Sequence, residues 1–241
     1  MIRSIVATII FLLVTIVLSI LSIPAALFDR SGSAYLWLAR FWSKIFLFLY
    51  GVKLHISGSS HIRKSEHYVY VANHSSYTDI PILLAAIPDN VRLILRHTLT
   101  RIPIWGTALL LSPMIIINRS NSSKAKKTLN KAIEIIRSGA SIMLFPEGTR
   151  THDGEMQPFK RGAFHMAYSG ATKIIPVAIK GSFELQSRTQ TLPSSNRDIY
   201  VSIGTPLEAS SQIENDRSRE MDLMQRAENA VREMLGALSP R

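Results

Sequence analysis

The sequence predicts an α/β fold in which a mixed, mainly parallel sheet is flanked by helices and preceded by a hydrophobic N-terminal helix pair. Three observations lead to this prediction. Residues 4–28 contain no charged side chain, and residues 34–52 form an aromatic-rich helical segment. After Gly51 the pattern changes to short apolar runs that alternate with amphipathic ones. Such alternation is typical of a sheet with helices on its faces.

Residues 1–52 are expected to form a membrane anchor of two helices. The 25 residues of the uncharged run exceed the roughly 20 that cross a hydrocarbon core as a helix. The run is longer than the apolar part of a signal peptide and lacks a clear cleavage site. Arg40 and Lys44 share one face of the second segment, which suits the lipid interface. Helix-breaking residues in the range 24–33 are expected to separate the two helices. The sequence is compatible with a re-entrant helix pair and with one membrane span followed by an interfacial helix.

Residues 53–241 are expected to form the α/β body. In such sheets, ligands bind beyond the carboxyl ends of the strands, and the unusual polar residues of this chain follow predicted strands. The predicted strands are residues 68–72, 92–95, 114–117, 141–145, 174–179 and 199–203. The predicted helices are residues 123–138, 162–169 and 217–235.

Composition limits the chemistry. The net charge of +11 favours anionic partners, namely phosphorylated substrates, anionic lipid headgroups or nucleic acid. The chain has no Cys, which excludes a protein thiol, disulfides and Cys-based zinc sites. A basic membrane-surface or nucleic-acid binding module is a possible class, but aromatic and basic residues do not interleave outside the N-terminal segment. We therefore expect no nucleic-acid partner.

The segment 73–79 reads Asn-His-Ser-Ser-Tyr-Thr-Asp. On a continuous helix, five positions would leave His74 and Asp79 roughly 140° apart. The two meet if His74 lies in a loop and Asp79 lies near the start of a helix. The carboxylate can then hold one imidazole nitrogen and leave the other as a general base for a hydroxyl group. Taken alone, the spacing fits an ordinary capping loop better.

A second cluster, Phe-Pro-Glu-Gly-Thr-Arg at residues 145–150, follows a predicted strand. A turn that contains glycine exposes backbone N–H groups beside Arg150, an arrangement that suits a phosphate. Lys160 and Arg161 precede a predicted helix start, where anions also bind well. The Gly-x-Ser-x-Gly elbow of serine hydrolases is absent, so a serine nucleophile in the segment 73–79 is not favoured.

Together these segments resemble four motifs of the glycerolipid acyltransferase family, in the family's order and spacing over about residues 53–206. The motifs are residues 73–79, 116–119, 145–150 and 174–178. Asn118 stands where an acidic residue often precedes the arginine, and Arg96 begins a stretch that often starts with lysine. The resemblance implies a glycerol-3-phosphate acyltransferase-like fold.

The resemblance is to bacterial members that transfer a fatty acyl group from acyl-CoA or acyl-carrier protein to the sn-2 hydroxyl of 1-acyl-sn-glycerol 3-phosphate, giving phosphatidic acid. It implies that His74 is the general base and that Asp79 orients it, without a metal or cofactor. Basic residues after the first segment favour the inner (cytoplasmic) membrane, with the catalytic domain on the cytoplasmic side. The substrate-binding residues implied by the resemblance are Arg96, Arg119, Glu147, Gly148, Thr149, Arg150 and Lys160.

Two alternatives remain open at this point. An acyltransferase of the same family could use another acceptor, such as a lyso-ornithine lipid, glycerol 3-phosphate or another lysophospholipid. A lipid hydrolase would instead release free fatty acid from the thioester. An assay with labelled acyl-CoA and a panel of acceptors separates these reactions.

Overall fold

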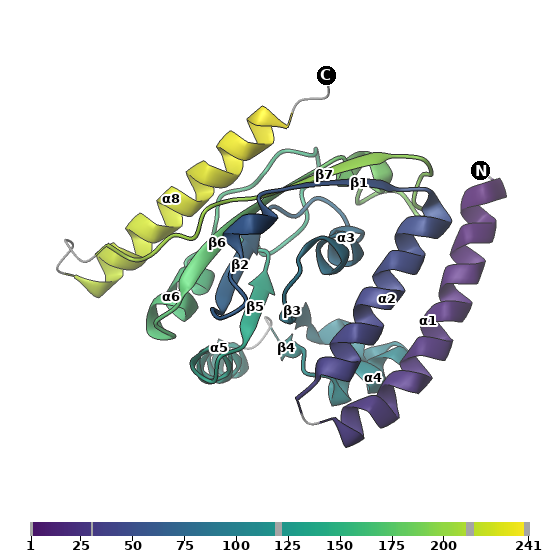
Figure 1. Cartoon of the computed structure of the whole chain (residues 1–241), viewed down its shortest axis with the longest axis horizontal. Helices are drawn as coiled ribbons and strands as arrows, with labels where there is room; N and C mark the ends of the chain where they lie inside the picture. The colour runs from purple at the N-terminus through teal and green to yellow at the C-terminus, as the bar shows by residue number, and fades with distance from the viewer. Residues whose placement is uncertain (1, 30, 119–121, 211–214, 239–241) are drawn as a thin grey trace.

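The computed structural model describes residues 2–29, 31–118, 122–210 and 215–238 (Figure 1). In these residues seven strands form one sheet with the order β1-β7-β6-β2-β5-β3-β4. The strands are β1 (Lys53–Ser57), β2 (Tyr68–Ala72), β3 (Val91–Arg96), β4 (Ile115–Ile117), β5 (Ser141–Leu144), β6 (Lys173–Lys180) and β7 (Asp198–Ile203).

The sheet is mixed and mainly parallel, as predicted. β6, β2, β5, β3 and β4 run parallel to one another. β7 is antiparallel to β6, and β1 is parallel to β7. The carboxyl ends of β6, β2, β5, β3 and β4 therefore meet at one edge of the sheet.

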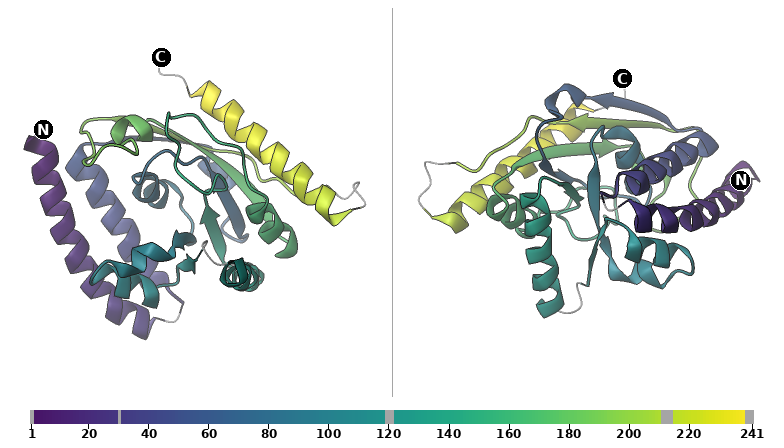
Figure 2. Two further views of the ribbon diagram at one scale, coloured as in Figure 1. Left: turned by 180° about the vertical axis from the view of Figure 1, so that it is seen from behind. Right: turned by 60° about the horizontal axis from the view of Figure 1, so that its bottom comes forward.

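Helices cover both faces of this sheet (Figures 1 and 2). The alternation along β2 explains the two layers, because Tyr70 packs into one hydrophobic core and Val71 into the other. Helices α1 to α4 lie over the first core, and α5, α6 and α8 lie over the second. The helices are α1 (Ile2–Phe28), α2 (Ser33–Tyr50), α3 (Asp79–Ala86), α4 (Trp105–Leu111), α5 (Ser122–Arg137), α6 (Gly162–Ser169), α7 (Ser182–Leu185) and α8 (Asp216–Ala237).

The two N-terminal helices lie side by side and run in opposite directions (Figure 1). Near one end the hydroxyls of Thr8 and Tyr50 are 2.6 Å apart, and farther along Trp42 donates a hydrogen bond to Thr15. Pro24 lies inside α1, so the helix does not end at this expected breaker. Of the helices in the described residues, only α1 is long and apolar enough to cross a membrane.

The elements β1 and α4 were not predicted from the sequence. β1 is largely exposed and lacks the apolar run by which the other strands were recognised. α4 follows a tight turn in which Trp105 donates its N–H to the carbonyl of Pro103, and Ile104 has φ 64° and ψ −61°. These angles are those of a γ-turn, a backbone conformation that a β-branched residue rarely adopts.

Candidate active site

The predicted site residues lie at the carboxyl edge of the parallel strands. His74 follows β2, Glu147 follows β5, and Arg96 is the last residue of β3. β2 and β5 are adjacent in the sheet, so the loops that follow them start side by side. Two hydrogen bonds join these loops: Thr151 donates its N–H to the His74 carbonyl at 2.9 Å, and His74 donates its N–H to the side-chain carboxylate of Glu147.

His74 and Asp79 form a hydrogen-bonded pair, as the sequence predicted. Asp79 is the first residue of α3, and His74 lies in the preceding loop. The His74 Nδ1–Asp79 Oδ2 distance is 2.8 Å, and the side chain of Asp79 is 0% exposed. An ionised carboxylate only accepts, so Nδ1 carries the proton of this hydrogen bond and Nε2 is left as the basic atom.

The Asp79 carboxylate is held by the loop that it organises. Its Oδ2 atom also accepts the backbone N–H groups of Ser75 and Ser76, each at 2.9 Å. A carboxylate at the start of a helix is further favoured by the helix dipole. Asp79 is thereby fixed in the position from which it holds the imidazole.

A second contact fixes the plane of the His74 ring. The ring of Phe145, the residue after β5, lies 3.9 Å from it between centroids, at an interplanar angle of 11°. The His74 side chain is 15% exposed. With one face on Phe145 and Nδ1 on Asp79, the imidazole has a defined orientation for accepting a proton at Nε2.

The hydroxyls of the nearby serines bond to groups other than the His74 imidazole. Ser75 Oγ lies 3.2 Å from Ser182 Oγ, and Ser76 Oγ accepts hydrogen bonds from Thr78. A serine nucleophile would need a hydrogen bond to the imidazole. The geometry therefore fits a histidine base that acts directly on a substrate hydroxyl.

Glu147 has a contact that was not predicted from the sequence. It is 2% exposed, and both of its oxygens accept backbone N–H groups: Oε1 from His74 at 2.6 Å and Oε2 from Gln157 at 2.9 Å. The carboxylate thus joins the loop that contains His74 to the segment that leads to α6. The expected contact of Glu147 with the acceptor stays a prediction.

Burial raises the pKa of Glu147 to about 7, although the two N–H groups oppose this shift. The folded protein consequently holds a proton that the unfolded chain has lost between about pH 4.5 and pH 7. The contribution of Glu147 to the free energy of unfolding is therefore largest below that window. It falls as the pH rises through the window and is constant above it. Glu147→Gln removes this titration, so we expect the wild type to lose on the order of 3 kcal/mol relative to the variant from about pH 4.5 to about pH 8.

Urea unfolding at several pH values in detergent measures this difference. Glu155→Gln, which changes an exposed glutamate in the same connecting segment, is the matched control and should follow the wild type. Parallel pH curves for wild type and Glu147→Gln would show that Glu147 does not bind a proton in this range.

The turn after β5 presents Gly148, Thr149 and Arg150. Gly148 has φ 79°, a left-handed conformation that favours glycine, and its N–H is donated to the carbonyl of Phe145. Thr149 is exposed. The Arg150 guanidinium lies over the ring of Tyr77, a residue that was not among the predicted site residues.

Arg96 and Lys160 are exposed, and in the described residues no side-chain hydrogen bond or ion pair joins them to His74, Asp79 or Arg150. The backbone of Lys160 does reach the third motif, because its N–H is donated to the carbonyl of Pro146. Arg119 lies outside the described residues.

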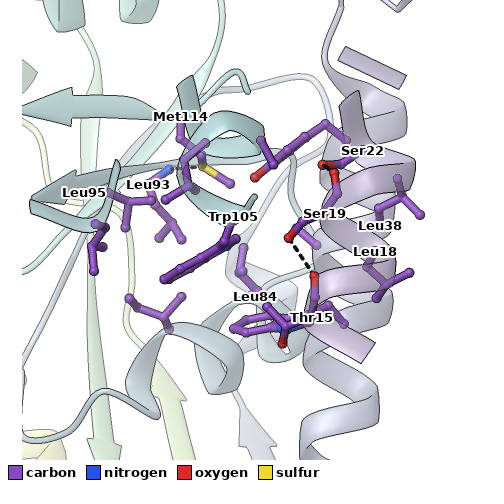
Figure 3. A pocket seen from close by; sticks show the side chains of 17 residues that line it. Thr15, Leu18, Ser19, Ser22, Leu38, Leu84, Leu93, Leu95, Trp105 and Met114 are labelled. Atoms are coloured by element: carbon purple, nitrogen blue, oxygen red, sulfur yellow. Dashed lines mark hydrogen bonds between the residues drawn. The ribbon is translucent and has the colours of Figure 1, made fainter. Parts of the chain in front are cut away.

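An apolar cavity of about 70 Å³ lies on the α1 side of the sheet (Figure 3). Its walls come from α1, α2, α3, α4 and β3. Ile80, the residue after Asp79, lines it, so the cavity reaches the helix that begins with Asp79. Most of the side chains labelled in the figure are apolar, whereas three from α1 carry hydroxyl groups, namely Thr15, Ser19 and Ser22.

The fold is similar to the crystal structure of the 1-acyl-sn-glycerophosphate (LPA) acyltransferase PlsC from Thermotoga maritima. The TM-score is 0.83 at 22% identity, and the match covers 100% of this chain and 98% of that chain. This likeness shows that the two proteins share a fold.

Curated relatives match over part of their length. The 1-acyl-sn-glycerol-3-phosphate acyltransferase alpha of Mus musculus is 29% identical over 170 residues, which are 70% of this chain and 60% of that protein. The 1-acyl-sn-glycerol-3-phosphate acyltransferase of Saccharomyces cerevisiae is 31% identical over 184 residues, 75% of this chain and 58% of that protein. The protein of the same name from Borreliella burgdorferi is 35% identical over 136 residues, 56% of this chain and 54% of that protein. The chain thus spans between 54% and 60% of the length of these relatives.

The family model described as Acyltransferase matches residues 53–180, more than half of the chain. This range contains all four motifs, together with the His74–Asp79 pair. The match to this family model agrees with the family resemblance that was inferred from the four motifs. The chain therefore belongs to the acyltransferase family.

Proposed function

We propose that this protein transfers a fatty acyl group from acyl-CoA or acyl-carrier protein to the sn-2 hydroxyl of 1-acyl-sn-glycerol 3-phosphate, giving phosphatidic acid. The observation that carries the proposal is the His74 Nδ1–Asp79 Oδ2 hydrogen bond, which leaves Nε2 as a base at the carboxyl edge of the sheet. The names of the curated relatives support the choice of acceptor.

The proposed reaction needs one proton transfer and one displacement. His74 Nε2 takes the proton of the acceptor hydroxyl as its oxygen attacks the thioester carbonyl carbon. The C–S bond breaks, an ester bond forms, and the thiolate leaves. Thiols ionise near ~8.5, so the thiolate is a good leaving group and regains a proton from the imidazolium. Asp79 stabilises that imidazolium throughout.

The acceptor's phosphate would be bound by the predicted cations, of which Arg119 and Arg150 belong to the second and third motifs. Arg150 is the best placed of them, because its Nη1 atom is buried and has no hydrogen-bond partner in the described residues. A charged, unsatisfied donor favours an anionic oxygen. Arg96, Arg119 and Lys160 would add positive charge, and the Gly148–Thr149 turn would shape the pocket.

The apolar cavity between α1 and the sheet would receive part of an acyl chain. Its lining is mainly apolar, the chemistry that hydrophobic ligands require, with hydroxyl groups contributed by Thr15, Ser19, Ser22 and Tyr35. Its extension to Ile80 on α3 would bring a bound chain toward the helix that begins with Asp79.

We further propose that residues 1–52 anchor the acyltransferase domain, residues 53–241, to the cytoplasmic side of the inner membrane. α1 supports this by the way its side chains are distributed. Its buried residues are small or polar, Ala7, Ser19 and Ser22, whereas its exposed residues are large and apolar apart from Arg3 and Pro24. Helices that contact lipid pack through small residues and turn apolar side chains outward. Leu110 of α4, which packs beside α1, extends this surface.

Substituting two of the exposed α1 residues is expected to weaken membrane binding. Leu13 and Val17 are four positions apart, so they share one exposed face of the helix. Leu13→Glu with Val17→Glu should lower the fraction bound to anionic phospholipid vesicles at least ~10-fold, because each side chain loses about 1.5–3 kcal/mol of burial. Met221→Glu, at an exposed apolar residue of α8, is the control. Equal vesicle flotation by both proteins would contradict the anchor.

The reaction itself is tested with purified protein, labelled acyl-CoA or acyl-carrier protein, and a panel of acceptors. We expect labelled phosphatidic acid from 1-acyl-sn-glycerol 3-phosphate and little free fatty acid. Preferred labelling of lyso-ornithine lipid, glycerol 3-phosphate or another lysophospholipid would overturn the acceptor assignment. Release of free acid without acceptor would instead identify a hydrolase.

A further inference from the structure

Tyr77 lies in the loop between His74 and Asp79, at a position for which the family motif specifies no residue. It is 59% exposed, whereas the neighbouring Ser76 and Thr78 are buried. Arg150 lies over the ring of Tyr77, with its Cζ atom 3.3 Å from the ring centroid. The ring therefore presents one face to the guanidinium of the third motif.

Among the described residues, the ring of Tyr77 is the aromatic face that lies against the Arg150 guanidinium. Its buried Nη1 makes no hydrogen bond in the described part of the chain. Asp79 attracts it electrostatically, but Arg188, which donates a hydrogen bond to the Arg150 carbonyl at 3.5 Å, opposes it with a charge of the same sign. The Tyr77 ring is thus one side-chain surface against which the guanidinium lies.

The orientation of this group matters for its chemistry. A guanidinium binds phosphate through a planar fork of N–H groups, so its plane must be set before the ligand arrives. A cation over an aromatic face is attracted by the ring quadrupole. The contact of Cζ with the face of the Tyr77 ring restricts where the guanidinium can lie, and it uses none of the N–H groups as hydrogen-bond donors.

We propose that Tyr77 is a positioning residue, whose ring holds the Arg150 guanidinium in the orientation that receives the acceptor's phosphate. The inference rests on the proposed function. It gives the His74–Asp79 loop a second role, because the loop that positions the base also supports, through one exposed ring, the cation that binds the acceptor.

Two substitutions of Tyr77 test the role of the ring. Tyr77→Leu keeps an apolar side chain but removes the ring, and we expect about a three- to tenfold rise in the acceptor KM, within the range of a cation–π contact. The donor KM and kcat should change less than about twofold, because His74 and Asp79 are not touched. Tyr77→Phe keeps the ring and should restore the acceptor KM to within about twofold of the wild type.

A double substitution shows whether Tyr77 acts through Arg150. Arg150→Ala alone should raise the acceptor KM more than Tyr77→Leu does. Adding Tyr77→Leu to Arg150→Ala should cause no further rise, because residues that share one interaction are not additive. Independent, multiplying effects would overturn the inference, as would a Tyr77→Phe protein that behaves like Tyr77→Leu. A fall in kcat with both KM values unchanged would also overturn it.

Equilibrium binding of lysophosphatidic acid to proteins that carry His74→Ala separates this inference from the proposed reaction, because binding needs no turnover. Monoacylglycerol, which lacks the phosphate, is the matched ligand. We expect Tyr77→Leu to weaken lysophosphatidic acid binding about three- to tenfold and to leave monoacylglycerol binding unchanged. Binding that Tyr77→Leu does not alter would overturn the inference alone, whereas a protein with no lysophosphatidic acid binding would overturn both proposals.

Discussion

Replacement of His74 by alanine is expected to lower kcat for acyl transfer at least ~100-fold, the low end for the loss of a general base. The imidazole is the only titratable side chain that hydrogen bonds to Asp79 in the described residues, and its ring is fixed by Phe145. Alanine leaves the backbone N–H of residue 74, which binds Glu147, in place. The loop that contains residue 74 should consequently keep its backbone conformation, while the reaction loses its general base.

The measurement is single-turnover formation of phosphatidic acid at saturating acceptor and donor. Circular dichroism and thermal unfolding in detergent establish that the variant is folded. The acceptor KM should stay within about threefold of the wild type, because His74 acts in the transition state more than in binding. Near-normal acyl transfer by a folded His74→Ala protein would refute the mechanism.

Asp79→Asn is expected to reduce kcat by about 10²- to 10⁴-fold, the upper figure being that of the corresponding change in a serine protease triad. The shape of the side chain is nearly preserved, but the negative charge that stabilises the imidazolium is lost. An amide nitrogen turned toward His74 would also place the proton on Nε2, and that nitrogen could no longer accept one.

The control for Asp79→Asn is a change beside the same loop that leaves the pair intact. Ser182→Ala removes the hydroxyl 3.2 Å from Ser75 Oγ, yet Ser182 touches neither His74 nor Asp79 through a hydrogen bond in the described residues. Its kcat should stay within about twofold of the wild type, because a neutral hydrogen bond outside the His74–Asp79 pair contributes mainly to stability. If Ser182→Ala were as slow as Asp79→Asn, the loss would reflect a displaced loop instead of a missing charge.

Much of the fold could be predicted because its central strands are buried on both faces. β2, β5 and β6 are short runs of apolar residues with polar residues after them, and these runs were recognised. β1 is an edge strand whose side chains are mostly exposed, so its residues carry no such pattern. α1 continues through Pro24, because one missing hydrogen bond does not end a helix that packs along its length.

The candidate site was predictable only in part. His74, Asp79 and Arg150 came from motifs, and the structure brings their loops together through contacts such as the Thr151 N–H with the His74 carbonyl. The internal role of Glu147 could not be read from sequence, because a buried carboxylate that accepts two backbone N–H groups depends on two loops far apart in the chain. Tyr77 was missed for a related reason: its partner lies 73 positions away.

The packing of α1 and α2 limits how the protein can be divided for study. Ala7, Phe46 and Tyr50 belong to the same hydrophobic core as Tyr70 and Leu83 beneath the sheet. A shortened chain that starts at residue 53 would uncover that core as well as one wall of the apolar cavity. Under the proposed anchor, a water-soluble form of this protein would therefore need polar substitutions on the exposed face of α1, with the helix itself retained.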